Sequence, residues 1–211
     1  MVRFEEGPHL YYDGGELIPS VTYILQCTGV ATPLNAYMRK ALARGRAVHK
    51  AIQLFDEGKL DFTTVDSRIE GWLQAFVTWQ GREGERFKRA RNEVVMHARS
   101  HGYVGKADKV VDEPDAHRIA VVEFKSGERE DWHALQVNAY QLAAIPAKYR
   151  KGLDRSPGGW LVYLHKNGTY DQEEVMFRIG PWLSVTQTFG FARERHMAEL
   201  KRRAREEALD D

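Results

Sequence analysis

Two neighbouring segments carry two acids and a lysine at spacings that suit phosphodiester hydrolysis. Asp108 ends the segment GKAD at 105–108, while Glu123 and Lys125 lie in the segment VVEFKSG at 121–127. Side chains alternate along a strand, so Glu123 and Lys125 project from the same face. Asp108, on an adjacent strand, brings its carboxylate toward Glu123. Because two carboxylates at one site repel each other unless a cation lies between them, this pattern predicts a metal site.

The expected metal is Mg²⁺ or Mn²⁺, since carboxylate oxygens suit hard divalent ions. A lysine beside them has two plausible roles, which are to position and deprotonate the attacking water or to neutralise the anionic transition state. Asp108, Glu123 and Lys125 together are the minimum for metal-assisted hydrolysis of a phosphodiester. An exposed strand-end acid is the alternative for either carboxylate, but a buried strand running into Glu123 needs a reason to carry that charge.

The elements that would position these residues follow an α/β order. Helices are predicted at 33–57 and 66–80, followed by three strands, a helix at 131–145, two more strands and a helix from about 181. The predicted strands are 92–99, 102–112, 117–125, 159–165 and 170–178. This order predicts a central mixed β-sheet flanked by helices, with a helical N-terminal region and a C-terminal helix.

The flanking segments show weaker signals. Asp13-Gly14-Gly15 indicates a short hairpin, and Ser20 is a candidate N-cap for a short helix that Gly29 would end. The segment 81–91 is expected to be a solvated connector. The charge-rich tail 201–211 is expected to be solvated or frayed.

Length and composition indicate one domain over residues 1–211, with the catalytic core at about 33–178 and the C-terminal helix at about 181–209. The 31 basic and 30 acidic residues argue against a protein that coats duplex DNA non-specifically, though not against a DNA enzyme with a locally basic channel. Cys27 is the only cysteine, which excludes an intrachain disulfide and a four-cysteine cluster. Without a signal-peptide core or an apolar run of membrane length, a cytoplasmic location is expected, in a bacterium or a phage-infected cell.

The motifs G-x-x-D and E-x-K-S-G, followed by Gln136 and Tyr140 one helix later, resemble the PD-(D/E)XK nuclease superfamily. The similarity is to its RecB-like branch, which includes many phage and bacterial exonucleases. His49, within GRAVHKAI at 45–52, resembles the helix histidine of that branch, and YDGGELIPSVT at 12–22 is similar to the start of phage-type members. The resemblance covers about residues 10–178. Ala107 stands where the superfamily name has proline, a departure common in the branch.

This resemblance implies a restriction-endonuclease-like core and a set of metal ligands. The implied ligands are Asp108, Glu123, the backbone carbonyl of Phe124 and His49, with Glu93 as a further candidate. Imidazole fits Mn²⁺ better than Mg²⁺, so His49 as a ligand predicts activity in both ions. The alternatives are a structural histidine at position 49 and an ordinary strand-end acid at position 93.

Two more groups of polar residues follow from the same resemblance. Gln136 and Tyr140 are four residues apart and share a helix face, which the resemblance places along the site. Gln136 would bond a phosphate or an active-site group, and Tyr140 would stack on a base or orient the scissile group; a buried polar pair is the alternative. Cations on the helix of His49 are candidates for contact with the DNA backbone, unless they form a solvated face: Arg39, Arg44, Arg46 and Lys50.

The function expected from these features is that of a divalent-metal-dependent DNA nuclease, with an exonuclease in phage or bacterial DNA recombination or processing favoured. A structure-specific or sequence-specific endonuclease on the same core is the first alternative. A non-catalytic nuclease-like domain that binds DNA or a protein is the second. The expected partners are DNA and either further copies of the chain or a recombination or helicase partner, with no membrane. Some RecB-like nucleases hold an iron–sulfur cluster, for which this chain lacks the cysteines.

Overall fold

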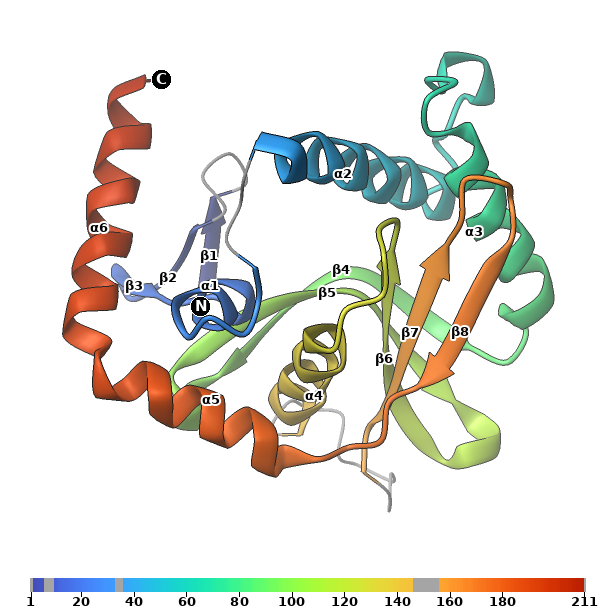
Figure 1. Cartoon of the computed structure of the whole chain (residues 1–211). Coiled ribbons are helices and arrows are strands. Elements are labelled where there is room, and N and C mark those ends of the chain that lie inside the picture. The colour runs from blue at the N-terminus through green and yellow to red at the C-terminus, as the bar shows by residue number, and fades with distance from the viewer. Residues whose placement is uncertain (1, 6–9, 33–35, 146–155, 211) are drawn as a thin grey trace.

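A five-stranded mixed β-sheet forms the centre of the molecule (Figure 1). The computed structural model describes residues 2–5, 10–32, 36–145 and 156–210, without the side chains of 36–39 and 207–210. The strands lie in chain order: β4 (Lys88–Ala98), β5 (Tyr103–Glu113), β6 (Arg118–Lys125), β7 (Gly158–Leu164) and β8 (Tyr170–Glu174). Only β6 and β7 run parallel, and the other neighbouring pairs are antiparallel.

Helices cover both faces of this sheet (Figure 1). On one face, α2 (Ala36–Asp56) and α3 (Glu70–Glu83) pack on apolar side chains such as Val122 and Phe124 of β6. On the other face, α1 (Val21–Cys27), α4 (Trp132–Ala144) and α5 (Ile179–Phe191) pack on side chains that include Val121. Val121 and Val122 thus serve opposite cores, as strand alternation requires. The α/β fold class predicted from the sequence is confirmed.

A second, three-stranded antiparallel sheet lies at the N-terminal end: β1 (Val2–Glu5), β2 (Leu10–Asp13) and β3 (Glu16–Ile18). The predicted hairpin is its β2–β3 part, and β1 was not predicted. Tyr11 and Ile18 pack on Val104 of β5, and Ser20 forms a backbone bridge to Val104, so this sheet is joined to the central one. The Ser20 hydroxyl accepts from the Tyr23 N–H at 3.1 Å, which confirms the predicted N-cap.

The prediction of a solvated connector at 81–91 was wrong at both of its ends, because α3 continues to Glu83 and β4 begins at Lys88. Phe87 between them is buried and stacks on Trp79 at 5.7 Å, which anchors the segment. Two of its basic side chains form ion pairs: Arg86 contacts Glu113 at 3.2 Å, and Arg89 contacts Asp112 at 3.5 Å.

The end of the chain also differs from its prediction. Two helices stand where one was predicted, since α5 ends at Phe191 and α6 runs over Arg193–Asp210. The tail is therefore helical to Asp210, and its charges pair along the helix, as Arg202 does with Glu199 at 2.9 Å. In the described part of the chain, no helix has both the length and the apolar character needed to cross a bilayer.

Gly105 on β5 allows α4 to approach the sheet closely. A Cβ atom at this position would lie 2.2 Å from Cε1 of Tyr140 and 3.2 Å from Cγ2 of Val21. We expect Gly105→Ala to destabilise the protein by about 1–3 kcal/mol, the usual effect of overpacking a core, and to displace Tyr140. Thermal unfolding measures the loss; Gly127→Ala, where a Cβ meets nothing within 4 Å, is the control. An unchanged unfolding midpoint in Gly105→Ala would contradict the close packing.

Candidate active site

Asp108 and Glu123 meet where strands β5 and β6 separate. The paired register of the two strands ends at Lys109 and Val122, the residues next to the two acids. The N–H of Phe124 donates to Oδ2 of Asp108 at 2.7 Å, so a side-chain carboxylate takes the place of a strand carbonyl. Oε2 of Glu123 lies 3.4 Å from the N–H of Asp108, a long contact. The structure therefore brings the two predicted acids together at the point where the ladder opens.

His49 reaches the same point from helix α2. Its Nδ1 lies 2.9 Å from Oδ1 of Asp108. An ionised carboxylate only accepts hydrogen bonds, so Nδ1–H is the donor. Val48, the preceding residue, is fully buried against the sheet, so this turn of the helix packs on the sheet. The helix histidine predicted from the sequence thus contacts a predicted metal ligand.

Glu93 on β4 completes a group of three possible ligands. It lies opposite Asp108, between the registered residues Asn92 and Val94. Its φ of 53° is in the left-handed region, which costs energy for a residue other than glycine and is shared here by Arg89 and His117. His49, Glu93 and Asp108 each offer one ligand atom, and these atoms lie within 4.8 Å of one another.

This donor set fits a hard or borderline divalent ion, because it joins two carboxylates to one imidazole. The residues in this group differ in part from the metal ligands predicted from the sequence. Glu93, a further candidate in the sequence, is in the group, whereas Glu123 is directed to Lys125 instead. Phe124 contacts the group through its N–H, and the role of its carbonyl stays a prediction.

Lys125 connects the acids to helix α4. Its Nζ donates to Oε1 of Glu123 at 3.0 Å and to Oε1 of Gln136 at 2.7 Å. Nε2 of Gln136 then donates to the hydroxyl of Tyr140 at 2.9 Å. Gln136 and Tyr140 therefore share the helix face that borders the site, and they hold the lysine by a continuous chain of hydrogen bonds.

Burial and neighbouring charges set the protonation of these groups. Burial, followed by the charge of Asp108, raises the pKa of Glu123 to about 7 against the opposing effect of Lys125. Burial lowers the pKa of His49, but the charge and hydrogen bond of Asp108 outweigh it and raise the value to about 9. Burial raises the pKa of Asp108, yet His49 and Lys125 hold it below its ordinary value. Without a metal, the site thus carries a proton on His49 at neutral pH.

This proton predicts a steep pH dependence of metal binding. A histidine ligand must be neutral, so a metal ion has to displace the proton from His49 at any pH below its pKa of about 9. We expect the affinity for Mn²⁺ to rise about tenfold per pH unit between about pH 6.5 and 8.5, the slope for one displaced proton. Calorimetric titrations across this range measure the slope, which should flatten in His49→Gln. An affinity that does not change with pH would contradict His49 as a ligand.

The cations proposed for DNA contact divide into different environments. Arg44 makes contacts within the protein. It donates to the carbonyl of Ser126 at 3.0 Å, and its guanidinium lies 4.8 Å from the ring centroid of Trp72. Arg46 and Lys50 are exposed on α2, where they remain candidates for contact with a phosphate backbone. Arg39 belongs to α2, but its side chain lies outside the described residues.

Two residues near the site were not predicted as parts of it. Tyr11 of β2 is 1% exposed, and its pKa is raised by burial and then by the charges of Glu93 and Glu123. Lys106 of β5 forms an ion pair with Glu93 and lies 4.7 Å from the ring centroid of Phe4 in β1. Both link the N-terminal sheet to the site. Only contacts between distant parts of the chain reveal them, and no local pattern carries that signal.

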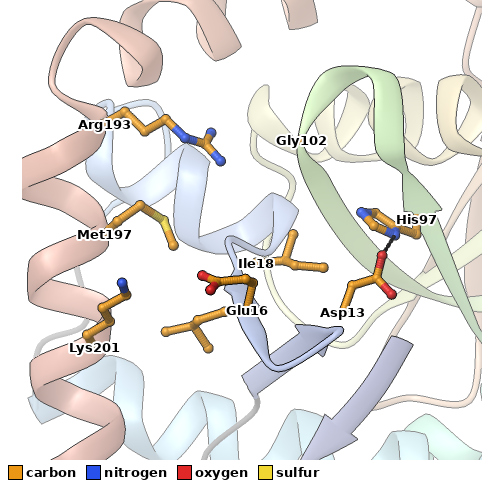
Figure 2. Close-up of a pocket in the computed structure, with 9 residues that line it drawn as sticks. Asp13, Glu16, Ile18, His97, Gly102, Arg193, Met197 and Lys201 are labelled. Carbon is orange, nitrogen blue, oxygen red and sulfur yellow. Dashed lines mark ion pairs between the residues drawn. The ribbon is translucent and has the colours of Figure 1, made fainter. Parts of the chain in front are cut away.

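A pocket of about 400 Å³ opens on another part of the molecule (Figure 2). Figure 2 shows Asp13 and Glu16 of the N-terminal hairpin on one side and Arg193 and Lys201 of α6 on the other. On the side of Asp13, Nδ1 of His97 lies 3.6 Å from Oδ2 of Asp13. The pocket mixes both signs of charge and shares no residue with the group of possible metal ligands, so it is separate from the candidate active site.

Two solved structures resemble this chain in fold but share little sequence with it. No protein-family model matches the sequence, and no curated protein matches it either. An alkaline exonuclease from Laribacter hongkongensis is similar in structure over 89% of this chain and 82% of its own, with 11% identity and a TM-score of 0.39. A protein from Eubacterium rectale described as a "putative exonuclease" is similar over 85% of this chain and 73% of its own, with 14% identity and a TM-score of 0.49. Similarity at this level carries no argument about function, which therefore rests on the site itself.

Proposed function

We propose that this protein is a divalent-metal-dependent nuclease that hydrolyses phosphodiester bonds in DNA. One observation carries the proposal: three possible metal ligands from three separate elements converge beside an acid–lysine pair held by hydrogen bonds. Structural ion pairs also place acids beside bases, but they do not require two carboxylates and an imidazole from three elements to lie within 4.8 Å of one another. This geometry supports a metal site with a cation placed next to it.

The residues divide into two sets by role. His49, Glu93 and Asp108 would hold the ion, with Glu93 released from its ion pair with Lys106. Glu123 would be available once its contact with Lys125 is released. When bound, a divalent ion neutralises phosphate charge and lowers the pKa of a bound water. Lys125, fixed between Glu123 and Gln136, presents its ammonium group to the pentacovalent phosphate or to the attacking water.

Tyr140 has a supporting role in this proposal. It is buried, and burial followed by the charge of Glu123 keeps its pKa well above the ordinary value, so the hydroxyl stays neutral. It accepts from Gln136 at 2.9 Å and thereby fixes the amide that holds Lys125. In this way α4 orients the lysine without contributing a charge of its own.

Within the nucleases we propose an exonuclease that acts in phage or bacterial DNA recombination or processing. This narrower proposal is supported by the resemblance of segments 12–22 and 45–52 to phage-type members of the RecB-like branch. Arg46 and Lys50 lie on the same helix as His49 and are exposed, which suits contact with the phosphate backbone of an approaching strand.

The proposal is tested with two DNA substrates of matched sequence, an end-labelled linear duplex and a closed circle. We expect Mg²⁺ and Mn²⁺ each to support degradation of the linear DNA only, with loss of activity in chelator and recovery when the metal is restored. Cutting of the circle would replace the exonuclease by an endonuclease on the same site. If neither substrate is cut in either metal, the proposed activity is wrong. Parallel assays with linear RNA determine whether the sugar matters.

A further inference from the structure

A buried ion pair lies directly beside the candidate active site. Lys109 follows Asp108 on β5, and its Nζ lies 2.7 Å from Oδ2 of Asp56 in the last turn of α2. The two side chains are only 4% and 11% exposed. The ammonium group lies 5.1 Å from the ring centroid of Phe76, inside an apolar cluster. Because desolvation often outweighs the attraction within a buried pair, stability alone is a weak explanation for it.

The pair forms the second of two contacts between the same strand and the same helix. Asp108 contacts His49, and Lys109 contacts Asp56. His49 and Asp56 are two helical turns apart, so they lie on the same side of α2. Along β5 the acid Asp108 precedes the base Lys109, whereas along α2 the base His49 precedes the acid Asp56. Each contact therefore joins an acid to a base.

We infer that the Lys109–Asp56 ion pair is a positioning device for His49, fixing α2 along and around its axis so that the imidazole reaches Asp108. Apolar contacts such as those of Val48 are not directional and tolerate small shifts of a helix. The 2.7 Å contact between the two buried charges forms in only one register, so the pair selects one position of α2. The effect on metal binding rests on the proposed function, whereas the effect on the His49–Asp108 contact does not.

The test compares Asp56→Asn with wild type by two measurements. The first is the NMR resonance of the Nδ1 proton of His49 in the metal-free protein, which we expect to be visible in wild type and lost in the variant. The second is the affinity for Mn²⁺ by calorimetry, which we expect to fall about 10–100-fold, the range for residues that orient metal ligands. Glu113→Gln is the matched control, because Glu113 is a buried acid at the far end of the same strand, paired with Arg118 at 2.6 Å. It should lower the unfolding midpoint without changing either measurement.

Two double variants separate positioning from stability. Asp56→Lys combined with Lys109→Asp restores a reversed pair and should restore both measurements. Asp56→Leu combined with Lys109→Met replaces the pair by apolar side chains, which keeps the protein folded but should leave the His49 resonance absent and Mn²⁺ binding weak. If this neutral variant, or Asp56→Asn, retains the resonance and binds Mn²⁺ within about twofold of wild type, the positioning role is wrong. If the resonance behaves as expected but wild type binds no Mn²⁺, the positioning role stands and the proposed function fails.

Discussion

Replacing Lys125 by alanine is expected to lower kcat for DNA cleavage by about 10²–10³-fold, the usual effect of removing one preorganised donor from a developing anion. Metal binding should respond in the opposite direction. The substitution removes a cation whose Nζ lies 3.0 Å from Glu123, so the remaining carboxylate should bind Mn²⁺ as well as before or better. Steady-state cleavage rates and calorimetric titration of Mn²⁺ measure the two effects on the same protein sample.

The control for this variant is Lys59→Ala, which removes an exposed lysine paired only with Glu57 near the end of α2. It should leave both the rate and the affinity unchanged. A Lys125→Ala protein that cuts DNA at the wild-type rate would show that Lys125 takes no part in catalysis. Weaker Mn²⁺ binding in Lys125→Ala would indicate that the lysine supports the fold of the site rather than the reaction.

Asp108→Asn is expected to abolish both cleavage and metal binding. Asparagine retains an oxygen to accept the N–H of Phe124, so the strands should keep their positions. The substitution removes the negative charge that pairs with His49 and would bind the metal. We therefore expect the Mn²⁺ affinity to fall by more than the roughly 10–100-fold seen for outer-shell residues. The substitution removes both the ion pair with His49 and a like-charge repulsion with Glu123. These effects oppose each other, so the unfolding midpoint should stay within about 4 °C of wild type.

Asp112→Asn serves as the matched control for Asp108→Asn. Asp112 lies four residues further along the same strand and contacts Arg89 at 3.5 Å, away from the possible ligands. It should leave cleavage and Mn²⁺ affinity unchanged. A folded Asp108→Asn protein that binds Mn²⁺ like wild type would remove Asp108 from the metal site and with it the present assignment of ligands.

The sequence predicted the residues whose signals are local. Asp108, Glu123 and Lys125 stand out because strand alternation and charge act over a few neighbouring positions. Helical spacing places Gln136 and Tyr140 on one helix face, and the resemblance to the RecB-like branch assigns that face to the site. The main helices and strands of the central sheet were also predicted, because their apolar periodicity is strong.

What the sequence did not predict depends on contacts between distant segments. The burial of Tyr11 beside Glu93 requires the N-terminal sheet to dock on β5, which no local pattern encodes. The grouping of Glu93 with His49 and Asp108 depends on the pairing of β4 with β5 and on the packing of α2, which no local pattern encodes. The packing of the segment 81–91 depends likewise on a contact outside it, since Phe87 stacks on Trp79 of α3.

The position of a bound divalent ion decides whether His49, Glu93 and Asp108 form a metal site. We would crystallise the wild-type protein with Mn²⁺ and compute the anomalous difference density. The expected result is one strong peak in contact with His49, Glu93 and Asp108 and next to Lys125. Saturation with Mn²⁺ that leaves this position without a peak, or that places the ion at another site, would contradict the proposed metal centre and the nuclease function derived from it.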